Sequence, residues 1–415
     1  MFSYLQTQNH KFLKKIGLDN IVNISGIKSN KITEIIASCN TCNGNSFSCI
    51  AIRTKNERFF LKNFKERLLF LKKQYNEDEN FQKMVRDIFI KPDCCGSFSE
   101  LSTLYFFSKL THKVKIEVQP LEDDTLSKEF KKKDGSIKNV SFVDGEVELE
   151  KDYPCFCYEV KSLQRNSHKI IDDIKKSVLK KLKETTNEDY YITCDYPFYI
   201  DEREIDKKKK SEIIEDIVEY LKIKKKPRWD IGLSFKIYKQ EPKITSEIHE
   251  VNYFKQAQNW EKYPLENAYQ FIISHCFIKV FVIHPLFYKE LNNNTDRKNL
   301  FRSLARRVFV NLTKDESNYP APENHSTSLK YSDVAKKLDG ILFIYDSSWE
   351  KSKKFTTKDY LSAYYSYFYL NPNSYKSEQE LAILGLFRMK INKVRFTPKN
   401  YILESDFDDF EFDNY

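Results

Sequence analysis

Residues 153–163 read YPCFCYEVKSL, and the expected fold follows from the pattern of these residues. A run of apolar side chains leads directly into Glu159-Val160-Lys161, as at the end of a buried strand. Because side chains alternate along a strand, Glu159 and Lys161 share one face while Val160 points to the other. Burying a carboxylate and an ammonium is costly unless both have partners. A divalent cation would use the first charge, and a phosphate would use the second.

Helical and strand patterns alternate on both sides of this stretch. SFSELSTLYFFSKL (97–110) predicts a helix with Ser97 as its N-cap and Glu100 in a capping box, and KVKIEVQ (113–119) predicts a strand. Further helices are expected at 168–184, 211–223, 264–275 and 296–312, and strands at 190–200, 230–238, 277–285 and 339–346. We therefore expect an α/β fold with a mixed central sheet flanked by helices.

The segment before Glu159 predicts a pair of strands. NVSFVDGEVELEKDYPCFCYEVKSL (139–163) contains two apolar runs, and Asp144-Gly145 is one turn that could join them. On this basis we divide the chain of 415 residues into three parts. We expect a lead-in domain at 1–90, the main α/β domain at 91–375 and a C-terminal extension with an acidic tail at 376–415.

Composition narrows the class of protein. Lys and Arg number 69 against 60 Asp and Glu, a net charge of +9, which permits an anionic partner without requiring one. Nine cysteines at irregular spacing are typical of a reducing compartment. No apolar run has the length of a signal peptide or a membrane span, so we expect a soluble cytoplasmic protein. Glycine-rich nucleotide loops are absent, so ATP or NAD use has no support.

Glu-x-Lys is a short motif, and its context gives it weight. Hydrolysis of a phosphodiester needs carboxylates that hold a metal ion and a cation that stabilises added negative charge. A helix carrying Glu100 precedes the motif, then a strand, then a strand pair ending in Glu159 and Lys161. The same residues would also fit a surface ion pair beside a capping-box glutamate.

This order of elements resembles the core of the PD-(D/E)XK nuclease superfamily, the restriction-endonuclease-like fold. The resemblance covers roughly residues 97–185. It implies that Glu100 is the helix acid, that Glu159 binds Mg²⁺ or Mn²⁺, and that Lys161 is the catalytic lysine. The family's hairpin aspartate is replaced here by Ser141, and Asp144 is the nearest substitute as a second metal ligand.

The resemblance also implies a function, a nuclease that cleaves DNA, in a setting such as restriction or antiphage defence. Lys175 and Lys176 on the following helix would contact the nucleic acid. Ser141 favours an alternative, a catalytically inactive module on the same fold that binds nucleic acid or protein. The sequence is also compatible with a homodimer or with another protein as partner.

Two further motifs have a functional and a structural interpretation each. Cys39-x-x-Cys42 has the local spacing of a structural Zn²⁺ site, although ordinary free thiols explain it too. On the helix expected at 296–312, a row of arginines would lie along phosphates or form a solvated face. These arginines are Arg302, Arg306 and Arg307.

Overall fold

The computed structural model of the chain describes the segments 18–37, 46–47, 58–111, 113–119, 131–132, 142–149, 154–163, 167–195, 207–223, 234–239, 253–271, 275–284, 294–321, 325–346 and 364–393. The chain forms two compact units. The first consists of Met1–Leu163 and Glu261–Asn414, and the second consists of Gln164–Trp260 with Tyr415. Each unit has its own hydrophobic core. Domain boundaries after residues 90 and 375 stay a prediction.

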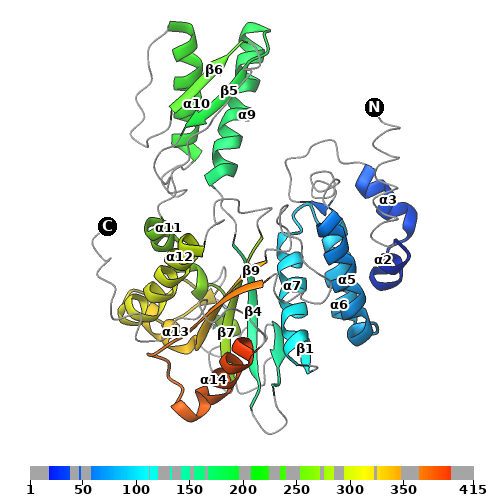
Figure 1. Ribbon diagram of the computed structural model, residues 1–415. Coiled ribbons are helices and arrows are strands. Elements are labelled where there is room, and N and C mark those ends of the chain that lie inside the picture. Colours follow the sequence, from blue (N-terminus) through cyan, green and yellow to red (C-terminus); the bar gives the residue numbers. More distant parts are fainter. Residues whose placement is uncertain are drawn as a thin grey trace. The chain divides into compact units, whose positions relative to one another are not determined.

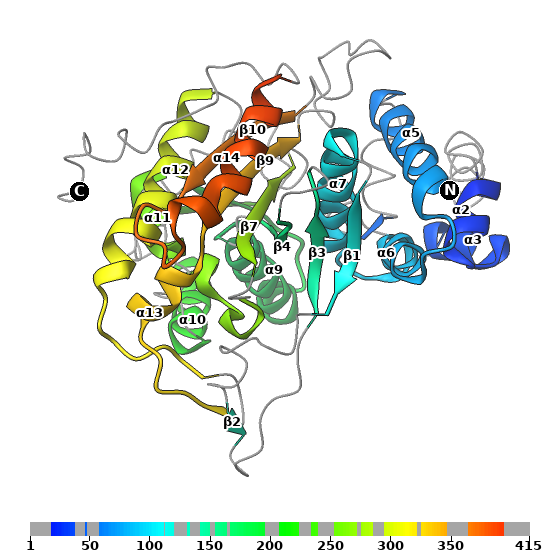
Figure 2. The ribbon, with the colours of Figure 1, turned by 90° about the horizontal axis from the view of Figure 1, so that it is seen from below.

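A mixed six-stranded sheet forms the centre of the first unit (Figures 1 and 2). Its strands, in spatial order, are β1 (Val114–Val118), β3 (Val143–Val147), β4 (Phe156–Ser162), β7 (Cys276–Ile283), β9 (Gly340–Asp346) and β10 (Tyr364–Leu370). The pairs β4–β7 and β7–β9 are parallel, and the other neighbours are antiparallel. The expected α/β class with a mixed sheet is therefore confirmed.

The central strands are buried on both faces. Every residue of β7, CFIKVFVI, and of β9, GILFIYD, is buried. Continuous apolar runs of this kind are typical of parallel strands that helices cover on both sides. Lys279 in the middle of β7 and Asp346 at the end of β9 are the charged exceptions to the apolar pattern.

Helices cover the two faces of the sheet. Helices α7 (Cys95–Leu110) and α14 (Glu378–Lys393) pack on the face that carries Phe156. Helix α12 (Asn294–Arg306) packs on the other face, where Phe301 stacks on Phe343 with ring centroids 4.4 Å apart. Figure 1 shows α7 and α12 on opposite sides of the central strands.

Helix α7 is buried on nearly all sides. It contacts strands β1, β4 and β7 and also helices α5 (Arg58–Tyr75) and α6 (Glu79–Ile90). Arg67 of α5 donates to both carboxylate oxygens of Asp346 at 2.6 and 2.9 Å, and Ser102 of α7 donates to the same carboxylate at 3.2 Å. This buried contact ties α5 and α7 to the end of β9. Helices α2 (Leu18–Ser25) and α3 (Ser29–Ala37) contact α6.

The second unit is built around its own small core. It contains α9 (Ser167–Thr186), β5 (Tyr191–Asp195), α10 (Lys207–Ile223), β6 (Ser234–Tyr238) and α11 (Tyr253–Trp260). Strands β5 and β6 pair antiparallel. The apolar stripe of α9 packs against α10 and this strand pair. The stripe residues that form this core are Ile171, Ile174, Val178 and Leu182.

Short elements complete the chain. They are the strand pair β2 (Lys131–Lys132) and β8 (His325–Ser326), the 3₁₀ turns η2 (Tyr263–Leu265), η3 (Ala268–Gln270) and η5 (Leu312–Lys314), the π-helical turn η4 (Arg307–Asn311) and helix α13 (Tyr331–Lys337).

Three local predictions are wrong. Asp144-Gly145 is not a turn, because both residues lie inside β3. Ser97 is not an N-cap: α7 begins at Cys95, and the Asp93 carboxylate accepts from the Cys95 backbone N–H at 3.0 Å. No α-helix runs from 264 to 271, where the chain makes two 3₁₀ turns.

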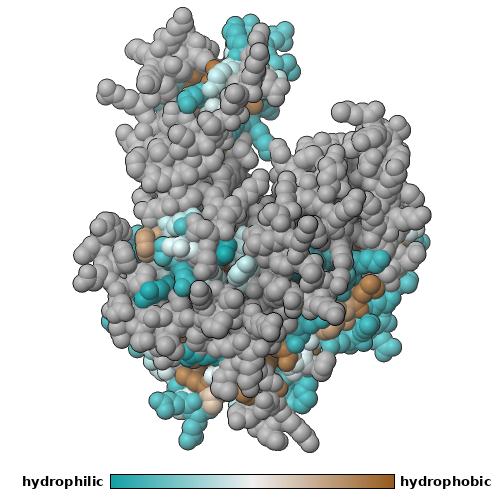
Figure 3. Space-filling model, viewed as in Figure 1, coloured by the Kyte–Doolittle hydropathy of each residue, from teal (hydrophilic) through white to brown (hydrophobic). Residues whose placement is uncertain are grey.

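No helix in the segments given above has the length and apolar content that crossing a bilayer requires. On the face shown in Figure 3, most of the coloured residues are hydrophilic and the apolar ones lie in small groups.

Gly145 is a position where the fold requires glycine. A Cβ there would lie 2.4 Å from the Tyr158 hydroxyl oxygen and 2.6 Å from the Lys115 carbonyl oxygen. We expect Gly145→Ala to lower the free energy of unfolding by about 1–3 kcal/mol, because overpacking displaces the neighbouring strand. Chemical denaturation measures the change.

Gly385 in α14 provides the matched control, because a Cβ there would meet no atom within 4 Å. Gly385→Ala should stabilise the protein by about 0.5–1 kcal/mol through helix propensity. Equal effects of the two substitutions would contradict the close approach of β3 to β4.

Candidate functional site

Strands β3 and β4 bring the predicted acidic residues to one place. Their paired ladder ends with Gly145 opposite Tyr158, and Asp144, the residue before Gly145, lies close enough to Glu159 to interact with it electrostatically. Asp144 Oδ2 accepts a hydrogen bond from the Val160 backbone N–H at 2.6 Å. The turn predicted at Asp144-Gly145 is wrong, and the position of Asp144 in β3 is what directs its carboxylate toward β4.

Glu159 lies between two lysines. It is 3% exposed, and Lys161 Nζ lies 2.6 Å from its Oε1. Lys279 of β7, directly beside Glu159 in the parallel register, donates to Oε2. Burial opposes ionisation of Glu159, but Lys279 and Lys161 outweigh it and hold its pKa below the ordinary value. Asn267 also donates to Oε1, at 3.3 Å.

Lys279 is the residue that sequence reasoning missed. It is fully buried, and besides Glu159 it donates to the Glu266 carbonyl oxygen at 3.0 Å. The signal was present in FIKVFVI (277–283), where a single lysine interrupts an apolar strand. A charge at such a position needs a buried partner of opposite charge.

Asp144 and Glu100 are acids in an unfavourable environment. Burial, and then the neighbouring Glu100 and Glu159, raise the pKa of Asp144 to about 8. Burial also raises the pKa of Glu100, which α7 carries close enough to act on Asp144. Burial opposes the charge of Lys161, but Glu159 raises its pKa above the ordinary value. The predicted site residues Glu100, Asp144, Glu159 and Lys161 thus interact electrostatically.

Asp144 and Glu159 are the residues that could hold Mg²⁺ or Mn²⁺. Clustered acids, one of them with a raised pKa, fit a divalent cation, which would balance their charge. Glu159 would have to exchange a lysine contact for the cation, because both of its oxygens accept from ammonium groups.

The predicted nucleic-acid contacts lie on different elements. Lys175 and Lys176 belong to α9 of the second unit, where Lys176 is exposed. Arg302 and Arg306 lie on α12, and Arg307 begins the π-helical turn that follows it. Arg307 lies 3.3 Å from the Glu261 carboxylate.

Several predictions lie outside the described residues. These are the Zn²⁺ site at Cys39 and Cys42, the expected aspartate position at Ser141, and the acidic tail.

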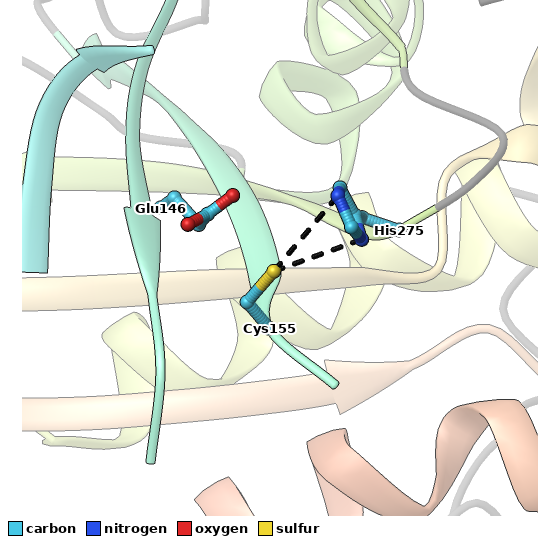
Figure 4. Close-up of side chains that lie close together, drawn as sticks. All are labelled: Glu146, Cys155 and His275. Carbon is cyan, nitrogen blue, oxygen red and sulfur yellow. Dashed lines mark hydrogen bonds between the residues drawn. The ribbon is translucent and has the colours of Figure 1, made fainter. Parts of the chain in front are cut away.

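A second cluster lies at the opposite end of β4. The ligand atoms of Glu146, Cys155 and His275 all lie within 4.8 Å of one another, and Figure 4 shows them converging from three neighbouring segments. Within the described segments, this is the one group of at least three carboxylate, thiol or imidazole side chains with that spacing.

No family model, curated protein or solved structure matches this chain. The geometry of these side chains is therefore what points to a function.

The raised pKa of Asp144 predicts a pH-dependent cost to stability. Its carboxyl ionises at about pH 4 when unfolded and at about pH 8 when folded, so the folded state binds the extra proton between these values. The contribution of Asp144 to the free energy of unfolding therefore falls as pH rises from about 4 to 8. Asp144→Asn removes this loss and keeps the acceptor for Val160.

Calorimetry of metal-free protein at pH 5 and pH 8.5 measures the effect. Asp144→Asn should raise the melting temperature at pH 8.5 by several degrees more than at pH 5. Asp216→Asn, at an exposed position of α10, is the control and should leave the difference unchanged. An equal shift at both pH values would contradict the raised pKa.

Lys279→Met should strongly destabilise the first unit, because Glu159 loses a fully buried counter-charge. Removing one partner of a buried ion pair typically costs about 3–5 kcal/mol. Lys161→Met should cost less, since the Lys161 side chain is 20% exposed and water replaces part of its role. Adding Glu159→Gln to Lys279→Met should restore part of the loss, measured by chemical denaturation. Failure of this rescue would show that the cost arises from packing.

Proposed function

We propose that this protein is a metal-dependent nuclease that hydrolyses phosphodiester bonds in DNA, of the PD-(D/E)XK type. The observation that carries the proposal is that Asp144 of β3 accepts from the Val160 backbone of β4 and interacts electrostatically with Glu159, which is paired to Lys161. Chemistry on a phosphodiester needs these groups together: acids for a metal ion and an ammonium for the phosphate.

Each residue has a distinct role in the proposed mechanism. Asp144 and Glu159 would hold Mg²⁺ or Mn²⁺, which when bound polarises a phosphoryl oxygen and lowers the pKa of a bound water. Asp144 would be ionised when it holds the cation. Lys161 keeps its charge, because Glu159 raises its pKa, and stabilises negative charge on the phosphate. Glu100 of α7 lies close enough to raise the pKa of Asp144 and would accept a hydrogen bond from water near the cation.

A second candidate function is a binding module without catalysis. The favouring observation is that Lys279 and Lys161 already neutralise Glu159. A permanent ion pair of this kind would make the cluster a structural part of the sheet. Such a module would bind nucleic acid through basic side chains, for which Arg302, Arg306 and Lys176 are proposed, or would bind a protein.

The experiment measures cleavage of plasmid and linear DNA, with RNA in parallel, in Mg²⁺, Mn²⁺ or EDTA. We expect cleavage that needs the metal and that Glu159→Gln and Lys161→Met reduce at least about 100-fold, since each removes a charge from the reaction centre. The matched controls are Glu148→Gln and Lys113→Met, which remove a more exposed ion pair after β3 and before β1. They should cleave as wild type does.

The two candidate functions give different outcomes. A binding module would show DNA binding that weakens with salt, does not depend on Mg²⁺ and survives Glu159→Gln. Absence of both cleavage and binding by folded wild-type protein would exclude a role in nucleic-acid chemistry.

A further inference from the structure

Glu146, Cys155 and His275 meet at the end of the sheet where β4 and β7 begin. Glu146 lies near the end of β3, Cys155 precedes β4 and His275 precedes β7. Because β3 runs antiparallel to β4 and β4 runs parallel to β7, the three residues lie at the same end of these neighbouring strands. Glu146 is buried, and the other two residues are half-buried.

The spacing fits a tetrahedral zinc ion. Zn–S and Zn–N bonds of about 2.3 and 2.0–2.1 Å at a tetrahedral angle separate sulfur from nitrogen by about 3.6 Å. Cys155 Sγ lies 3.6 Å from His275 Nδ1. The carboxylate of Glu146 lies within 4.8 Å of both ligand atoms, a gap that a small side-chain rotation closes.

The charges of the cluster also suit this ion. Zn²⁺ bound by one thiolate and one carboxylate is neutral, so its burial carries little electrostatic cost. Lys115 pairs with Glu146 Oε1, which leaves Oε2 for a metal ion and fixes the direction of the carboxylate. A thiolate and an imidazole favour zinc over magnesium, which prefers oxygen ligands.

We propose that Glu146, Cys155 and His275 bind one Zn²⁺ ion, with water in the fourth position. This site shares no ligand with the proposed nuclease centre: Glu146 follows Asp144 by two residues in β3, and Cys155 precedes Glu159 by four residues, about 13 Å along a strand. The proposal therefore does not depend on the proposed function.

A thiol–imidazole nucleophile is the competing interpretation of the same residues. In such a pair the acid orients the histidine and the thiol is activated. Here the Glu146 carboxylate acts on the thiol as well as on the imidazole, and burial together with this carboxylate raises the pKa of Cys155 to about 11. A metal ion removes this conflict, because it binds the thiolate and the carboxylate together.

The site would join two parts of the chain that are distant in sequence. In sequence, Cys155 precedes the second unit, Gln164–Trp260, and His275 follows it. A metal bond between them closes this long loop, and cross-links across long loops remove most conformational entropy from the unfolded chain. Zinc would therefore fix the pairing of β4 with β7.

Metal analysis and cobalt spectroscopy of the full-length protein test the proposal. After incubation with ZnCl₂ and dialysis against excess Mg²⁺, we expect one retained zinc equivalent. Co²⁺ should give a thiolate-to-metal absorption band in the near ultraviolet. Cys155→Ser and His275→Ala should lose both signals. Cys194→Ala, which removes a buried thiol of the second unit, should keep them.

A second measurement needs no variant. Zinc should protect Cys155 of the wild-type protein from alkylation at least about tenfold, read by mass spectrometry. No retained zinc, or zinc retained equally by both site variants, would overturn the proposal, and the second result would place the ion elsewhere. Rapid alkylation of Cys155 at pH 7 regardless of zinc would also overturn it, in favour of an activated thiol.

Discussion

Glu159 and Lys279 meet inside the sheet where β4 runs parallel to β7, and almost no part of either side chain reaches water. Neither charge could be buried alone, since each would cost several kcal/mol. Their pairing fixes the register of the two strands, because a slip by one residue would turn Lys279 toward the apolar face. The positions of Lys161 and of the neighbouring Asp144 follow from that register.

The acids of this cluster differ in how well their negative charges are balanced by partners. Glu159 has two ammonium groups and an amide, whereas Asp144 has one backbone N–H and two acidic neighbours that oppose its ionisation. Natural proteins tolerate such unfavourable acids chiefly where function needs them. Glu159 therefore forms a structural ion pair, whereas Asp144 next to it has the unfavourable environment that is typical of a functional residue.

Sequence patterns predicted the elements better than their ends and their contacts. Alternation in KVKIEVQ and the apolar run of 277–285 gave β1 and β7, because local periodicity reports burial directly. Ser97 failed as an N-cap because Asp93 supplies the acceptor earlier. Asp144-Gly145 has turn chemistry but lies in a strand, since Gly145 is needed where Tyr158 approaches.

Contacts between distant segments leave no local pattern. The order of elements predicts that Glu100, Asp144, Glu159 and Lys161 belong to one site, and in the structure the other three act electrostatically on Asp144. Lys279 lies 120 residues from Glu159 in sequence, and no local pattern near either residue indicates which residue is its partner.

The α7 helix has a consequence for protein synthesis. Its apolar surface leaves the ribosome long before β7 exists to cover it, so the nascent chain offers a binding site to chaperones until β7 emerges.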